Sequence, residues 1–315
     1  MSRFRFFDDE EIKLTGDNVA VSQGLQTSDA EREVSSKKYR YRVEQTIIMK
    51  INGMIVSHGV TKQEYLMQKN FGGNNLRSLG FELVENVLKF NPDQLEVAID
   101  LICELDKIKA LVEVIPNQET GKMLAIADKS KALLAWNDYK KVMAERFSFL
   151  KSEQERESIN AFVDLMENQL NDDVLLLNDY ESRIFYDLIF DRYLLGKESF
   201  LPSEKNYLSN LFPHHLVLLN VAPFINQKTA TTVSVKQVGV LDPKSVDQAG
   251  IVNFYDENYK PQVGYRFSDY NYSLIGNYLY ETVDNILLEA ELTITEEVKN
   301  NVEMIIDYRL KRVEL

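Results

Sequence analysis

Two carboxylates spaced four residues apart come nearest to a catalytic pair in this sequence. Asp187 and Asp191 lie in a mainly apolar segment, and Arg183 precedes them by one helical turn. On a helix this spacing places both carboxylates on one face, where an enclosed pair shares a proton or holds a divalent ion. The pattern favours a plainer interpretation, in which the two carboxylates lie on a narrow solvent-exposed stripe of the helix and are neutralised by Arg183 and Arg192.

Other residues that carry chemistry are few. The adjacent pair His214 and His215 would point to opposite faces of a strand and so cannot easily chelate one ion, and His58 follows a hairpin strand. Cys103 lies in an apolar periodic stretch, where a thiol acts as a small hydrophobic residue. No zinc-binding spacing, phosphate-binding glycine loop or G-x-S-x-G elbow occurs. We therefore expect no catalytic residue, no metal site and no cofactor.

A tyrosine- and asparagine-rich segment is the best candidate for a recognition surface. Residues 252–281 hold seven of the 16 tyrosines. Tyrosine offers a large apolar face and a hydroxyl group at little entropic cost, which suits partner binding, although cross-strand tyrosine pairs explain the same composition. The candidate partner-binding residues are Tyr255, Tyr259, Tyr265, Phe267, Tyr270 and Tyr272.

The charge balance makes nucleic acid an improbable partner. The chain has 49 acidic and 36 basic residues, and its net charge of −13 repels polyphosphate. The basic cluster at 37–42 alternates with tyrosines, as on the solvated face of a strand. No apolar run is long enough to span a membrane, and the N-terminus turns acidic before a signal segment can form. We expect a cytoplasmic protein.

The elements that position these residues begin with a β-hairpin. Tyr39 to Ile51 alternates apolar and charged residues, Asn52-Gly53 suits a two-residue turn, and 54–60 supplies the return strand. Further strands are expected at 81–90, 112–114 and 123–127, with a helix at 92–105.

A helical segment follows, from 128 to 195. The spacing of apolar residues predicts three helices, of which the third runs from Asp172 or Asp173 to Leu195. Because the third helix is apolar nearly all round, we expect it to lie buried between a sheet and the other two helices.

The β pattern resumes after Pro213. Strands are expected at 215–221, 231–241, 251–255, 286–294 and 302–310. Because alternating strands without intervening helices favour antiparallel pairing, the sequence predicts an α+β fold. In this fold the N- and C-terminal β portions form one curved antiparallel sheet or open barrel on the central three helices, and the first and last strands pair. Residues 1–36 form an irregular arm, and 37–315 form a single domain with β portions at 37–127 and 213–315.

Three functions remain open. The leading one is a non-enzymatic adaptor, chaperone or accessory subunit that binds another protein through the tyrosine-rich β face or the concave side of the sheet, with homo-oligomers possible. The second is a carrier of a lipid-like ligand in an apolar cavity. The third is a carboxylate- or metal-dependent hydrolase that uses Asp187 and Asp191.

Overall fold

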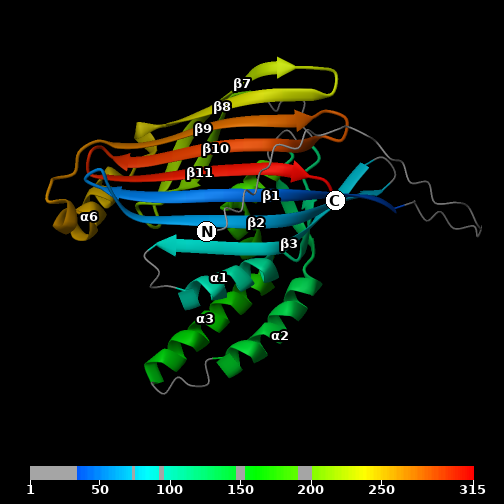
Figure 1. Cartoon of the computed structure of the whole chain (residues 1–315), viewed down its shortest axis with the longest axis horizontal. Helices are drawn as coiled ribbons and strands as arrows, with labels where there is room; N and C mark the ends of the chain where they lie inside the picture. Colours follow the sequence, from blue (N-terminus) through cyan, green and yellow to red (C-terminus); the bar gives the residue numbers. More distant parts are fainter. Residues whose placement is uncertain (1–33, 73–74, 92–95, 147–152, 191–200) are drawn as a thin grey trace, which may run out of the picture. The chain divides into compact units, whose positions relative to one another are not determined.

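An antiparallel sheet of eleven strands dominates the computed structural model, which describes residues 34–72, 75–91, 96–146, 153–190 and 201–315 (Figure 1). The strands are β1 (Val34–Ile51), β2 (Met54–Gly72), β3 (Asn75–Asn91), β4 (Val112–Pro116), β5 (Met123–Asp128), β6 (Ser203–Leu208), β7 (Leu216–Lys228), β8 (Thr232–Leu241), β9 (Tyr270–Glu281), β10 (Ile286–Val298) and β11 (Val302–Val313). The helices are α1 (Glu96–Lys109), α2 (Ser130–Arg146), α3 (Glu153–Asn171), α4 (Asp173–Glu181), α5 (Ile184–Ile189), α6 (Gln248–Asn258) and α7 (Lys260–Val263).

The strand order joins the two β portions into one sheet. It runs β5-β4-β3-β2-β1-β11-β10-β9-β8-β7-β6, so each portion is a meander and the first and last strands pair in the middle. The predicted antiparallel sheet and the predicted pairing of its terminal strands are confirmed. The sheet is not closed, since β5 and β6 end the order. The predicted arm, 1–36, lies outside the described residues except for 34–36, which belong to β1.

The predicted hairpin is confirmed at β1 and β2. Asn52 and Gly53 take φ values of 50° and 76°, the left-handed geometry of a two-residue turn that matches strand twist. The backbone N–H of Asn52 donates to the carbonyl oxygen of Asn301 at 2.8 Å, which joins this turn to the turn between β10 and β11.

The two faces of the sheet differ in chemistry. The inner face, on which Tyr41, Tyr65 and Leu292 are buried, packs against helices. Phe185 of α5 stacks on Tyr65 of β2 with ring centroids 3.7 Å apart, so the aromatic core joins α5 to the sheet. Across the middle of the opposite, outer face, charged residues pair between strands, as in Arg42–Glu64 at 3.2 Å.

The third helix was predicted to be continuous from Asp172 or Asp173 to Leu195, and this prediction is wrong. The structure ends α4 at Glu181 and begins α5 at Ile184, so the described residues between 128 and 190 form four helices. Ser182 donates its hydroxyl to the carbonyl of Asp179 at 2.7 Å, a local bond that competes with helical hydrogen bonding. Arg183 is extended, with φ −96° and ψ 127°. Residues 191–195 lie outside the described part.

The predicted strand at 251–255 is also wrong, because these residues belong to α6. Asp247 caps this helix by accepting a hydrogen bond from the N–H of Gly250 at 3.0 Å. Ile251 and Tyr255, four residues apart, are both buried in a second core cluster, so their spacing follows a helical period. Figure 1 shows α6 at the end of the sheet where β9 begins.

Candidate functional site

The tyrosine-rich segment divides among three kinds of structure. Tyr255 lies on α6, and Tyr259 lies between α6 and α7. Tyr265 and Phe267 lie in the connection that leads to β9, which carries Tyr270 and Tyr272. The structure therefore places these side chains around one end of the sheet rather than on a single β face.

A buried carboxylate organises this end. Glu296 of β10 is fully buried and accepts hydrogen bonds from the Tyr270 hydroxyl at 2.8 Å, from the N–H groups of Asn210 and Leu211 at 2.7 and 3.2 Å, and from the Ser209 hydroxyl. Burial and the neighbouring Glu296 raise the pKa of Tyr270, so this phenol remains a donor. The four donors satisfy the buried charge and hold the 209–212 loop against β9 and β10.

The other tyrosines of the segment mainly support the helices. The Tyr255 hydroxyl accepts a hydrogen bond from the Asn301 amide at 2.8 Å and donates to the Tyr265 carbonyl at 3.2 Å. The Tyr259 hydroxyl donates to the Leu211 carbonyl at 2.7 Å, and burial, followed by the charge of Glu296, raises the pKa of Tyr259 to about 12.

The exposure of the six predicted residues limits which of them a partner can reach. Tyr255 and Tyr272 are buried, Tyr259, Phe267 and Tyr270 are half-buried, and Tyr265 is 65% exposed. A partner approaching this segment would first meet Tyr265.

The two predicted carboxylates are not both described. Asp191 lies outside the described residues. Asp187 pairs with Lys205 of β6, whose Nζ lies 3.0 Å from one carboxylate oxygen. Arg183 instead contacts Asp106 at 2.8 Å and Asp179 at 3.0 Å. The sequence pattern did not predict β6, so it missed Lys205 as the counterion.

The histidines do not gather into a site. His214 occupies a turn with φ 68°, ahead of β7, which begins at Leu216, so the predicted regular strand does not include it. The His215 ring lies 3.0 Å from the Pro213 carbonyl and 3.9 Å from Asp247. Among the residues that the structure describes, no three His, Cys, Asp or Glu side chains form a group that could hold a metal ion.

Strand pairing brings apolar side chains together on the outer face of β6 to β9. Apolar side chains that are 48–59% exposed come from each of these strands, among them Leu208, Leu216, Val240 and Ile275. Leu208 lies opposite Leu216, and Val238, the outward neighbour of Val240 along β8, lies opposite Ile275. Half-buried Leu218, Ala222 and Val238 lie among them. We call these seven residues the outer apolar surface.

Comparison with known proteins identifies no family. No family model matches the chain, and no curated protein matches it. A solved structure concerned with lipid–protein interactions in lipovitellin aligns with 90% of this chain and 26% of that chain, at 10% identity and a TM-score of 0.40. This chain thus spans about a quarter of the length of that protein, and the likeness is too low to show a shared fold. None of the described helices is both long and apolar enough to cross a membrane.

Proposed function

We propose that this protein is a non-enzymatic accessory subunit that binds another protein through the outer apolar surface. The observation that carries the proposal is the continuity of that surface, because four strongly exposed apolar side chains come from four successive strands. Single exposed apolar residues are ordinary, whereas contiguous exposed patches mark interaction sites.

The rest of the outer face supports this contrast. In the middle of the sheet, many outward side chains are charged and paired, as in Lys50–Glu303 at 2.7 Å and Lys311–Glu289 at 3.2 Å. Such a solvated face needs no partner. Exposed apolar side chains also occur on other strands, such as Ile55 of β2 and Val87 of β3, but the outer apolar surface joins residues of four successive strands, next to the edge strand β6.

Charge indicates the chemistry of the partner. Glu204 lies in the same cross-strand row as Asn220 and Val240, whereas Glu291, beside the row of Ile275, shares its row with Lys236. With a net charge of −13, this chain favours a partner whose apolar contact surface has a basic rim.

The test replaces outward side chains and compares two ends of the sheet. In the double variant Val240→Asp/Ile275→Asp, a protein that co-purifies and cross-links to the wild type at β7–β9 should be lost, because charges would be buried without partners. Val87→Asp is the matched control, since Val87 is an exposed outward valine on β3. Equal capture by all three forms, or cross-links that avoid β6–β9, would remove this surface from the proposal.

The carrier of a lipid-like ligand remains a second proposal, supported by one feature of the inner face. Ile47, Met49 and Met304 are only half-buried there, between the two core clusters. An acyl chain would cover them. Organic extraction of native protein followed by mass spectrometry separates the two functions, because a stoichiometric lipid supports the carrier and a clean blank opposes it.

A further inference from the structure

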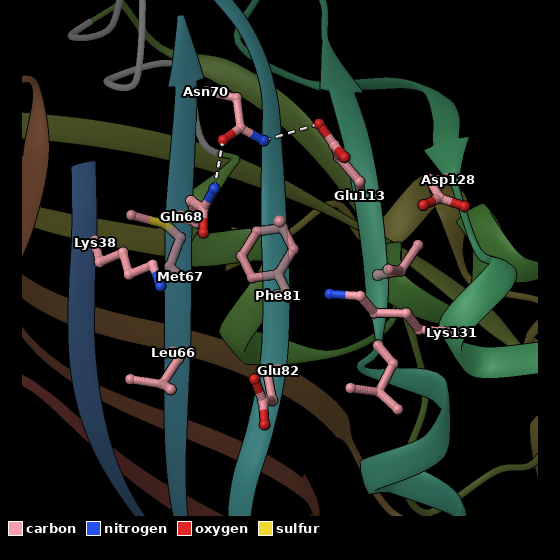
Figure 2. A pocket seen from close by; sticks show the side chains of 13 residues that line it. Lys38, Leu66, Met67, Gln68, Asn70, Phe81, Glu82, Glu113, Asp128 and Lys131 are labelled. Atoms are coloured by element: carbon pink, nitrogen blue, oxygen red, sulfur yellow. Dashed lines mark hydrogen bonds between the residues drawn. The ribbon is translucent and has the colours of Figure 1, made fainter. Parts of the chain in front are cut away.

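A hollow of about 170 Å³ lies on the outer face at the other end of the sheet, over β1 to β5 (Figure 2). It is built on one cross-strand row, because register places these residues side by side on successive strands: Lys38, Gln68, Gly80, Glu113 and Asp128. Lys131, in the first turn of α2, adds a second ammonium group to the lining.

Gly80 creates this hollow, and nothing in its backbone requires a glycine. Its φ is not in the positive region, and a Cβ atom placed on it would meet nothing closer than Gln68, at 3.8 Å. A glycine inside a strand costs roughly 0.5–1 kcal/mol relative to alanine. Where no turn or close backbone contact explains such a glycine, a common reason is the close approach of a ligand.

The negative wall of the hollow is held in place by amides. Asn70 donates to one carboxylate oxygen of Glu113 at 2.8 Å, and the Ser78 hydroxyl donates to the same oxygen. Gln68 in turn donates to Asn70 at 2.8 Å, as Figure 2 shows. Among the described residues, the other oxygen of Glu113 accepts no hydrogen bond, which leaves it available to a ligand.

The positive groups of the hollow face carboxylates without touching them: Lys131 lies near enough to Asp128 to help lower the pKa of that carboxyl group. Within the described part of the chain, neither Lys38 nor Lys131 forms an ion pair, unlike the paired lysines in the middle of this face. Figure 2 shows the two side chains reaching toward the hollow from opposite sides. The N–H of Ser130 donates to Asp128 at 2.8 Å and lowers the pKa of that carboxyl group, so the hollow carries fixed charges of both signs.

The size and the charges select the ligand. A water needs about 10–15 Å³ by the same measure, so the hollow accommodates a molecule of roughly ten non-hydrogen atoms. The hollow is partly open to solvent, and its charged lining favours a small molecule that carries both charges. We propose that the hollow over Gly80 binds a small zwitterion of the amino-acid type, whose carboxylate faces Lys38 and Lys131 and whose ammonium group faces Glu113. This site goes beyond the proposed protein binding and does not depend on it.

The first experiment screens the twenty common L-amino acids singly against the full chain by thermal shift, followed by calorimetry of those that raise the melting temperature. At least one should bind, and its methyl ester and its N-acetyl form should bind about tenfold more weakly or not at all, because each lacks one charge. If no amino acid binds the wild type, or if both blocked forms bind equally well, the proposal is wrong.

Variants then locate the bound molecule. Gly80→Val fills the hollow with a side chain that suits a strand, so it should abolish binding while the melting temperature is kept or raised. Thr46→Val, on the outer face of β1 away from the hollow, should bind normally. Lys131→Gln changes an exposed helical position without touching the core, and we expect at least about threefold weaker binding. Unchanged affinity in both Gly80→Val and Lys131→Gln would overturn the assignment of the site.

Discussion

Lys69 should make the stability of the fold increase with pH in an alkaline range where most proteins change little. Its side chain is only 2% exposed on β2, and its Nζ donates to the carbonyls of Asp284 and Asn285 at 2.7 and 2.9 Å. Burial lowers the pKa of this amine from its ordinary 10.5 to about 8, and the nearby Asp284 only partly opposes that effect.

The sign follows from proton binding. Between pH 8 and 10.5 the unfolded chain keeps a proton on this amine that the folded protein has lost, so the free energy of unfolding rises with pH. The added stability is complete above 10.5 and disappears as the pH falls through 8. From pH 7 to pH 9 these two pKa values correspond to an increase of about 1.3 kcal/mol.

Urea unfolding at pH 7, 8 and 9 measures this increase, with Lys69→Met as the comparison. Buried tyrosines with raised pKa values, such as Tyr41, destabilise the fold as the pH approaches 10, but they do so equally in both proteins. The difference between the two stability curves should therefore grow by about 1.3 kcal/mol from pH 7 to 9. Lys50→Met removes a charge from the outer face, and its curve of unfolding free energy against pH should run parallel to that of the wild type. Parallel curves for wild type and Lys69→Met would refute the reasoning.

Three further changes test the packing by urea unfolding. Glu296→Gln should lower the free energy of unfolding by about 2–3 kcal/mol, because an amide cannot accept hydrogen bonds from all four donors. Glu297→Gln, on the outer face, should change the free energy of unfolding by no more than about 0.5 kcal/mol. Arg183→Met should lower the free energy of unfolding by about 1–3 kcal/mol, since it leaves the half-buried Asp106 without its counterion and Asp179 with Lys109 alone, and removal of the exposed Arg309 should change it very little; equal effects would contradict the role of the pairs. Gly53→Ala should cost about 1 kcal/mol because its φ is 76°, and an unchanged stability would count against the turn geometry.

The strands and their pairing were predictable where alternation was strict. From Tyr39 to Ile51 most apolar residues share one parity, with Gln45 and Ile48 as exceptions, and Asn52-Gly53 supplies a turn with its own geometry, so local signals and tertiary structure agree there. The pairing of β1 with β11 followed from the same alternation at both ends of the chain.

The errors occurred where a short apolar run has two interpretations. Ile251 to Tyr255 can be a buried strand or one helical turn, and the aspartate cap at 247 decides for the helix. β6 has only six residues, and its polar residues alternate with few apolar ones, so its pattern is weak. The break at Ser182 depends on a single hydroxyl and on the pairing of Arg183 with Asp106, a residue 77 positions away.

Neither the hollow nor the outer apolar surface could be predicted from the spacing of residues along the chain, because each depends on how neighbouring strands are aligned. The hollow needs Gly80 to lie between Gln68 and Glu113, and the apolar surface needs Val238 to lie opposite Ile275. A shift of one residue on any of these strands would turn the side chains to the inner face. Register is held by the buried core on that face, so the packing of the inner side chains determines which outward residues meet. The binding chemistry of the outer face thus depends on the inner core without touching it.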